Sequence, residues 1–444
     1  MRVLSLLITL FISSSLLGLP ISPQIVSLPE KATADYVSTL KKVTDIMVYD
    51  VTSPVASARY YAYVTLSAYE VLAQARPTQY PSMAQALKQD ALNIDKTASQ
   101  GVVVEQAVFL AILKAGEKLL PSGQKLKPEI AALMQSYSLK NKETAEKSAA
   151  LADKVVNEIA QWAKNDGFRQ LNNLQRYTPK SALEFWKPTA PAFMAPVEPH
   201  WAKVRTFLLD SAQQFKPQPP TLYDLTPGSS FYRQAQEVRD IVNAKNKKQQ
   251  EIAQFWDCNP YAISQMGHVE FGLKKISPGG HWVGITGIFC KKAKTPFEKT
   301  VLVHALLSVT MHDAFVACWD EKYRSNRVRP ETVINQNFDP LWRPLLQTPP
   351  FPEYVSGHSV VSSASAVVLT RLFGTKTRFT DDTEVEFGLP KRTFKSFQHA
   401  ADEACMSRLY GGIHYMDAIE QGKWQGKMVG EWAVNKLADF FSFF

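Results

Sequence analysis

Helical periodicity runs through most of this sequence and limits the folds that it can adopt. Apolar residues recur at helical spacing, whereas the alternation expected of half-buried strands is scarce. The pattern predicts helices over 37–49, 53–74, 102–119, 128–136, 142–164, 231–245, 249–256, 295–320, 359–373, 394–407 and 412–437. Ser53 and Pro54 supply an N-cap followed by a proline in the first turn. The sequence therefore predicts an all-α protein.

A proline-rich stretch over 176–229 divides the helical pattern into two parts. Aromatic residues accompany the prolines, namely Trp186, Phe193, Trp201 and Tyr223. They favour a belt packed over a helical body, because a long structureless linker inside a domain is uncommon. We expect two packed helical bundles, over 30–175 and 230–444, joined by this belt.

The first residues have the composition of a secretory signal peptide. Arg2 precedes a short apolar run over 3–12, and serines follow at 13–15. The apolar character is broken by these serines and ends at Pro20, whereas a membrane anchor needs ~20 predominantly apolar residues. We expect residues 1–22 to be a signal peptide. The mature protein would then be periplasmic or extracellular, with no membrane span after cleavage.

The charge balance and the cysteines exclude several other classes of protein. Lys and Arg number 50 and Asp and Glu 41, which gives a formal net charge of +9 without a basic block typical of nucleic-acid binding. The surplus fits an anionic small ligand.

Four cysteines are too few for a disulfide scaffold, although export permits a pair. Cys258 and Cys290 bracket a loop-rich stretch and are the favoured pair, whereas Cys318 and Cys405 are expected as buried thiols.

Two clusters lie in the last third of the chain: the first supplies two cations, and the second supplies the start of a predicted helix. Lys322 and Arg329 lie two helical turns apart, so a helix would place them on one face, and a proline follows Arg329. Ser356, Gly357 and His358 open an apolar run. Backbone N–H groups at a helix N-terminus favour an anion, and glycine allows a close approach to it.

A third cluster adds Arg408 and His414, each near a predicted helix end. Three cations, a hydroxyl and a helix N-terminus fit an oxyanion that carries two or three charges. The two histidines, His358 and His414, would supply a nucleophile or ligand and an acid–base group. Each signal alone is typical of a surface charge or an ordinary helix start. Their conjunction predicts an oxyanion site.

In order and spacing, these clusters read K-x6-R-P, S-G-H and S-R-x5-H. This resembles the signature of the superfamily of type-2 phosphatidic acid phosphatases and vanadium-dependent haloperoxidases. The neighbouring stretches 257–261 and 277–282 are similar to those of exported bacterial haloperoxidases, including iodide-oxidising ones. The resemblance is specific over 256–430 and looser before it. The histidine in the second stretch, His281, is expected in a loop near the pocket.

The resemblance implies that the cofactor is vanadate, with His414 as the ligand to vanadium. It also implies which residues hold the vanadate oxygens, namely Lys322, Arg329, Ser356, Gly357 and Arg408. His358 would be the acid–base group, and Lys322 would donate to bound hydrogen peroxide. Iodide or bromide would be oxidised to hypohalous acid, which halogenates a small organic acceptor. The residues expected along the halide approach are Trp319, Phe351 and Tyr261.

The same residues also fit two other functions. In a phosphate-ester hydrolase of the acid phosphatase type, His414 would be the nucleophile and His358 would protonate the leaving oxygen. A non-catalytic oxyanion-binding protein would not need His358.

The sequence departs from the family pattern at two positions. Val355 stands where the family usually has proline, before Ser356. The family places an aspartate four residues after the final histidine, whereas Asp417 follows His414 by three. Either spacing reaches along a helix face. Asp417 is therefore a candidate to orient His414, with a backbone carbonyl as the alternative.

Overall fold

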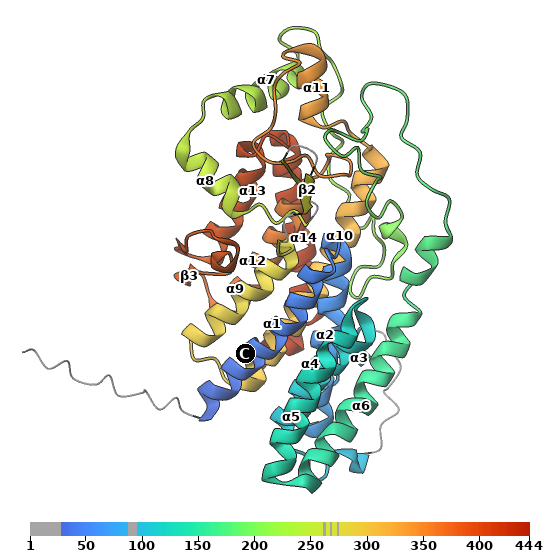
Figure 1. The fold of residues 1–444 in the computed structure, drawn as a ribbon, viewed down its shortest axis with the longest axis vertical. Coiled ribbons are helices and arrows are strands. Elements are labelled where there is room, and N and C mark those ends of the chain that lie inside the picture. Colours follow the sequence, from blue (N-terminus) through green and yellow to red (C-terminus); the bar gives the residue numbers. More distant parts are fainter. Residues whose placement is uncertain (1–27, 88–95, 261–262, 267–268, 273–274) are drawn as a thin grey trace, which may run out of the picture.

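The computed structural model describes residues 28–87, 96–260, 263–266, 269–272 and 275–444. The predicted signal peptide over 1–22 and the predicted halide-pocket residue Tyr261 lie outside the described residues. The described part consists mainly of helices with two short hairpins, which confirms the all-α prediction (Figure 1).

The elements follow one another from α1 at the N-terminal side to α15. The α-helices are α1 (Leu28–Tyr49), α2 (Pro54–Ala75), α3 (Met83–Ala86), α4 (Val104–Leu119), α5 (Lys127–Lys140), α6 (Lys142–Lys164), α7 (Ser230–Asn243), α8 (Lys247–Phe255), α9 (Pro278–Lys292), α10 (Phe297–Ser325), α11 (Pro330–Asn337), α12 (Gly357–Phe373), α13 (Phe397–Tyr410), α14 (Met416–Lys436) and α15 (Ala438–Ser442). Short 3-10 helices are η1 (Lys96–Ser99), η2 (Gly123–Leu126), η3 (Phe168–Asn173), η4 (Trp201–Lys203) and η5 (Val385–Phe387). The antiparallel hairpins pair β1 (Ile263–Met266) with β2 (Val269–Gly272) and β3 (Phe379–Asp381) with β4 (Arg392–Phe394).

The predicted helices correspond to observed ones, and one pair of bounds, 142–164, is that of α6. The predicted start of α2 is also confirmed, because the Ser53 hydroxyl accepts the N–H of Ala56 at 3.2 Å. Four α-helices were not predicted, namely the short α3 and α15 and the longer α9 and α11. Helix α9 begins with Pro278 and two glycines, a composition typical of a loop, but Ser277 caps it by accepting the N–H of Gly280 at 3.1 Å.

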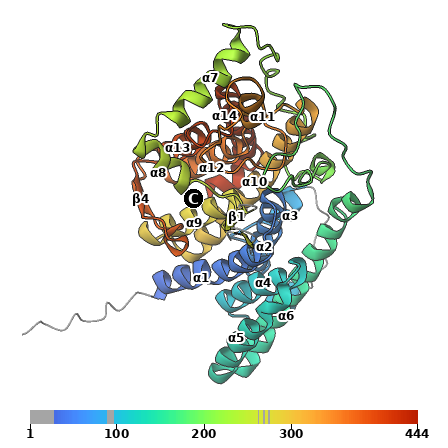
Figure 2. The ribbon, with the colours of Figure 1, turned by 45° about the horizontal axis from the view of Figure 1, so that its top comes forward.

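Helix α10 is the central element, and α2 packs along it. The helix is long and apolar enough to cross a membrane, but its whole apolar window is buried inside the protein. Figures 1 and 2 show α4, α5 and α6 at the lower end of the molecule and α7 and α11 at the upper end, with α12, α13 and α14 below α7 and α11 and beside α10. One hydrophobic core contains residues from both halves, so the two predicted bundles are joined along α2 and α10.

Part of the proline-rich stretch over 176–229 is held against the helical body by hydrogen bonds. Asp313, in the middle of α10, accepts the backbone N–H groups of Phe207, Leu208 and Leu209 at 2.7, 2.6 and 2.9 Å. Burial raises the pKa of this carboxyl to about 6. Asp313 therefore anchors the belt to the core, which explains a buried acid in an apolar helix.

Three glycines bring α14 unusually close to α12. Gly422, Gly426 and Gly430 recur every four residues and so share one helix face. A Cβ at Gly426 would lie 2.1 Å from the carbonyl oxygen of Val360, and one at Gly422 would lie 2.9 Å from that of Ser356. The glycine face thus fixes the start of α12, where Ser356 donates its N–H to the carbonyl of Ala418 at 3.0 Å.

All four cysteines are free and buried, so the expected pair of Cys258 and Cys290 is wrong. Cys290 lies in α9, and its thiol is near Thr295 and Thr300. The thiol of Cys258 instead lies 3.4 Å from Nδ1 of His281. The buried thiols predicted at Cys318 and Cys405 are confirmed.

Candidate active site

The three predicted cations meet around one cavity, although they come from different helices. Lys322 lies in the last turn of α10, Arg329 is the N-cap residue of α11, and Arg408 lies in the last turn of α13. Their exposed fractions are 0%, 0% and 1%. Charged side chains are almost never this deeply buried without a partner of opposite charge. This arrangement therefore calls for an anion.

Backbone carbonyls hold all three cations in place, and Arg408 donates to the carbonyl of Trp256 at 3.0 Å. Nζ of Lys322 donates to the carbonyls of Pro352 and Glu353 at 3.0 and 3.1 Å, and to a third just before α12. The Arg329 guanidinium donates to the carbonyl oxygens of Phe351 and Ile413, both at 2.9 Å. These carbonyls carry no net charge, so they orient the cations without neutralising them.

The N-terminus of α12 faces the same cavity. Ser356 is its N-cap, and its hydroxyl oxygen accepts the N–H of Ser359 at 3.3 Å. Gly357 follows as the first helical residue, whose N–H has no acceptor within the helix. A Cβ at Gly357 would lie 3.6 Å from the Trp319 ring and 3.9 Å from Cε of Lys322. The glycine therefore leaves the helix end open toward the lysine.

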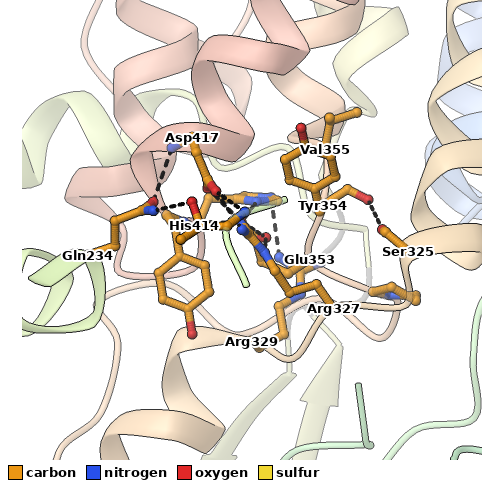
Figure 3. A network of polar contacts seen from close by, with 12 residues as sticks. Gln234, Ser325, Arg327, Arg329, Glu353, Tyr354, Val355, His414 and Asp417 are labelled. Atoms are coloured by element: carbon orange, nitrogen blue, oxygen red, sulfur yellow. Dashed lines mark hydrogen bonds and ion pairs between the residues drawn. The ribbon is translucent and has the colours of Figure 1, made fainter. Parts of the chain in front are cut away.

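His414 is oriented by Glu353, which the sequence analysis missed. The Glu353 carboxylate lies 2.8 Å from Nδ1 of His414 and also accepts the N–H of Tyr415 at 3.1 Å (Figure 3). Because a carboxylate only accepts, the imidazole proton lies on Nδ1. Nε2 then carries the lone pair, and it lies 3.2 Å from Nη1 of Arg329.

Neither of the two candidates for orienting His414, Asp417 and a backbone carbonyl, holds its Nδ1, because Glu353 does. Asp417 forms a two-pronged ion pair with Arg327, with distances of 2.7 and 2.6 Å, and Arg327 in turn donates to Glu353 at 2.6 Å (Figure 3). Asp417 is the second residue of α14. Its carboxylate faces Arg327 and also accepts the backbone N–H of Thr221. It acts on His414 only through Arg327 and Glu353.

Three polar groups around the cavity have no hydrogen-bond partner among the described residues. They are Nη2 of Arg329, Nε of Arg408 and Nε2 of His358. Buried donors and acceptors are normally paired, and a buried unpaired one is costly. Together with the open N-terminus of α12, these groups fit an oxyanion such as vanadate or phosphate.

Burial lowers the pKa of the basic groups around the cavity, namely Lys322, Arg329, Arg408, His358 and His414. Burial is the main reason that the pKa of Lys322 falls to about 7 and that of Arg329 to about 9. The pKa values of His358 and His414 lie well below the ordinary value, first through burial and then through neighbouring cations. Both histidines are therefore neutral at neutral pH. A bound anion would reverse the shift at Lys322.

Aromatic residues form the other wall of the cavity. The rings of Trp319 and Phe351 have centroids 4.9 Å apart, and Nζ of Lys322 lies 5.7 and 5.1 Å from them. The structure thus places both predicted halide-pocket residues beside the lysine. The cavity lining comprises Pro54, Cys258, Asn259, Pro260, Pro278, Phe315, Trp319, Pro349, Phe351, Gly357, His358, Arg408 and His414.

Two residues that fix this geometry, Glu353 and Arg327, were present in the sequence clusters but received no role. Each lies close to a predicted residue: Glu353 three before Ser356, and Arg327 two before Arg329. The available signal was a charged residue inside the first motif and another shortly before the second. Sequence spacing did not show that they meet, because 26 residues separate them along the chain.

A helical fold whose buried cations and carboxylate-held histidine surround one cavity defines a class of oxyanion-binding enzymes. Comparisons with known proteins are consistent with that class. The family model described as the VCPO second helical-bundle domain matches residues 302–442. A comparison with curated proteins found no match.

Solved structures identify the family. The crystal structure of a bacterial vanadium-dependent iodoperoxidase is 43% identical, with a TM-score of 0.86, over 91% of this chain and 96% of that chain. A holo-type bacterial vanadium-dependent chloroperoxidase is 16% identical, with a TM-score of 0.67, over 88% and 93%. The second likeness concerns the fold alone. The chain belongs to the vanadium-dependent haloperoxidase family, which confirms the resemblance seen in its sequence.

Proposed function

We propose that this protein oxidises iodide, and bromide as a further substrate, with hydrogen peroxide in a vanadate-dependent reaction. The observation that carries the proposal is the set of buried, unpaired cationic donors around Nε2 of His414, the ring nitrogen that carries no proton. The relative of 43% identity, a vanadium-dependent iodoperoxidase, supports the choice of halide. The hypohalous acid that forms would halogenate a small organic acceptor.

The residues present fit vanadate. His414 offers Nε2 as the ligand to vanadium, and its orientation is held at Nδ1 by Glu353. The residues proposed to hold the vanadate oxygens are Lys322, Arg329, Ser356, Gly357 and Arg408. Bound vanadate supplies a Lewis acid that activates hydrogen peroxide.

The protein's own groups would handle the proton and the halide. His358 is neutral, and its Nε2 has no partner, so it can accept a proton from hydrogen peroxide. Lys322, whose pKa is about 7 in the absence of an anion, can donate a hydrogen bond where negative charge develops. Trp319 and Phe351 exclude water from the side of the halide. All of these groups are buried, which strengthens their electrostatic effect.

The test incubates the purified apoprotein with vanadate or with phosphate. Iodide and bromide oxidation by hydrogen peroxide are then measured beside hydrolysis of p-nitrophenyl phosphate. We expect iodide oxidation that requires both vanadate and peroxide. Ester hydrolysis without any halide oxidation would overturn the proposal and favour the phosphatase, with His414 as nucleophile.

A matched pair of variants tests the halide pocket. Phe351→Ala should change the ratio of iodide to bromide oxidation while vanadate retention stays close to that of the wild type, because Phe351 offers no polar side-chain atom to the anion. Phe440→Ala is the control, since Phe440 is a buried phenylalanine of α15 that packs on Tyr69. Equal changes in both variants, or loss of vanadate with Phe351→Ala, would contradict this role.

We also propose that the protein is exported. The basic, apolar and serine-rich order of residues 1–22 supports this. Mass spectrometry of the N-terminus of the mature protein, taken from the periplasm or the medium, tests it. A full-length chain retained in the cytoplasm would contradict export.

A further inference from the structure

A second buried histidine, beside the catalytic cavity, lies in a cluster of opposite charge. His281, in the first turns of α9, is 0% exposed, and Cys258 and Glu384 beside it are 1% and 2% exposed. Nδ1 of His281 lies 3.4 Å from the Cys258 thiol and 3.3 Å from Oε1 of Glu384. The three groups come from distant parts of the chain.

The protonation of His281 is fixed by a further carboxylate. Nε2 of His281 lies 2.7 Å from Oδ2 of Asp381. The other oxygen of Asp381 accepts the N–H and the hydroxyl of Thr383 at 3.0 and 2.8 Å. Because this carboxylate only accepts, a proton lies on Nε2. Burial lowers the pKa of His281, but the charge of Asp381 outweighs it and holds this pKa well above its ordinary value, so a metal at Nδ1 has to displace a second proton. With that proton gone, Nδ1 presents its lone pair to the thiol and to Glu384.

This arrangement leaves electron-rich atoms facing one another. Oε1 of Glu384 has no hydrogen-bond donor among the described residues, although it is buried and aimed at Nδ1. A lone pair and a carboxylate oxygen at this distance repel each other unless a positive charge lies between them. Either a proton or a metal ion can supply that charge.

The spacing matches the ligands of a tetrahedral metal. With Zn–S of about 2.3 Å and Zn–N or Zn–O of about 2.0 Å, tetrahedral angles put sulfur and nitrogen about 3.5 Å apart and nitrogen and oxygen about 3.3 Å apart. The measured separations are 3.4 and 3.3 Å, and all the ligand atoms lie within 4.8 Å of one another. The contact from His281 to Asp381 is the carboxylate–histidine–metal arrangement that orients metal-bound imidazoles.

We propose that Cys258, His281 and Glu384 bind a divalent transition metal of the zinc class, with water as the fourth ligand. Thiolate, imidazole and carboxylate together suit zinc better than magnesium or calcium, which prefer oxygen ligands. On binding, the thiol and Nδ1 of His281 release their protons to solvent. The thiolate, the Glu384 carboxylate and the doubly charged cation then neutralise one another, and the Asp381 carboxylate behind His281 keeps its own negative charge.

The metal would fix a segment that lines the catalytic cavity. Cys258 lines that cavity, and Trp256, two residues earlier, stacks on the His281 ring with centroids 4.5 Å apart. The carbonyl of Trp256 accepts from Nη1 of Arg408 at 3.0 Å. The metal would thus hold in place the Trp256 carbonyl, which accepts a hydrogen bond from Arg408. This metal site does not depend on the proposed reaction, because none of its ligands is a residue to which that reaction assigns a role.

Metal content of the wild-type protein is the first test. The complete chain is produced without a histidine tag, because such a tag binds zinc, and is kept free of vanadate. We expect stoichiometric zinc by inductively coupled plasma mass spectrometry. After replacement by cobalt, we expect the intense visible bands of tetrahedral Co²⁺ and a near-ultraviolet charge-transfer band from the thiolate. Folded protein that takes up neither metal, or a cobalt spectrum without the thiolate band, would overturn the proposal in favour of a bound proton.

Variants give the second test. Cys258→Ser should abolish the thiolate band, whereas Cys290→Ser, at another buried free cysteine, should keep it. Asp381→Asn should weaken cobalt affinity by about 10- to 100-fold, as expected for a residue that orients a metal ligand. A thiolate band that persists in folded Cys258→Ser protein, or disappears in Cys290→Ser, would overturn the assignment.

Discussion

Two histidines near one cavity are held in the same way but with opposite ring nitrogens. Glu353 accepts from Nδ1 of His414 at 2.8 Å, so Nε2 is the nitrogen that faces the cavity, whereas Asp381 accepts from Nε2 of His281 at 2.7 Å, so Nδ1 is the nitrogen that faces the other cluster. Nε2 of His414 accepts from Nη1 of Arg329 at 3.2 Å. Nδ1 of His281 lies 3.4 Å from a thiol and 3.3 Å from a carboxylate.

The difference shows that the surroundings of a histidine decide what it binds. Around His414 the uncompensated charges are the cations Lys322, Arg329 and Arg408, so the site favours an anion. Around His281 the uncompensated groups are acidic, so the site favours a cation. The carboxylate behind each ring only fixes which nitrogen is available.

The strongest way to separate the two sites is to remove the first histidine. His414→Ala should abolish vanadate retention and halide oxidation, because no other side chain offers a ligand nitrogen at that position. Cobalt binding at the second site should remain. Equilibrium dialysis with vanadate and the cobalt spectrum measure the two effects. Retained vanadate, or loss of both ligands from folded protein, would contradict the separation.

Removing the negative charge behind His414 should have the next largest effect. In Glu353→Gln the imidazole loses its charged acceptor and Arg327 loses one of its two carboxylate partners. We expect vanadate affinity to fall by about 10- to 100-fold. Vanadate titration followed by halide oxidation measures it. Unchanged affinity would show that Glu353 does not orient His414.

The cationic site should also be visible in the pH dependence of stability. Burial lowers the pKa of Lys322 from 10.5 to about 7, so between these values the folded protein binds fewer protons than the unfolded chain. The free energy of unfolding then rises with pH in this window, by at most about 1.4 kcal/mol per pH unit from this group. Urea unfolding of anion-free protein should show a smaller rise in Lys322→Met than in the wild type. Lys427→Met, at a mostly exposed lysine, is the control, and equal slopes in all three proteins would contradict the shift.

Asp417 should have the smallest effect of these residues. In Asp417→Asn, Arg327 keeps its ion pair with Glu353, and Glu353 keeps its contact with His414. Vanadate affinity should fall less than about 10-fold, below the range for residues that touch a metal ligand directly. The same vanadate titration measures it. A loss as large as that of Glu353→Gln would restore Asp417 as the orienting residue.

The sequence predicted much of the fold, and it singled out the lysine, arginines and histidines that the structure gathers around one cavity. Helical periodicity located most of the helices because burial of one face imposes a regular apolar spacing. The sequence analysis missed helix α9 because its proline and glycines are typical of loops. It also missed the close contact of α12 with α14, although Gly422, Gly426 and Gly430 share one face of α14. The recurring glycines were a usable signal.

By itself, the sequence determined which chemical groups this protein brings to its site: lysine, arginines, a serine–glycine helix start and two histidines. Only the tertiary structure decided how they are paired. Glu353 rather than Asp417 holds His414, and Cys258 lies beside His281 rather than Cys290. The physical reason is that spacing along the chain fixes contacts within a helix. Hydrogen bonds and ion pairs between residues of different helices depend on how those helices pack in space.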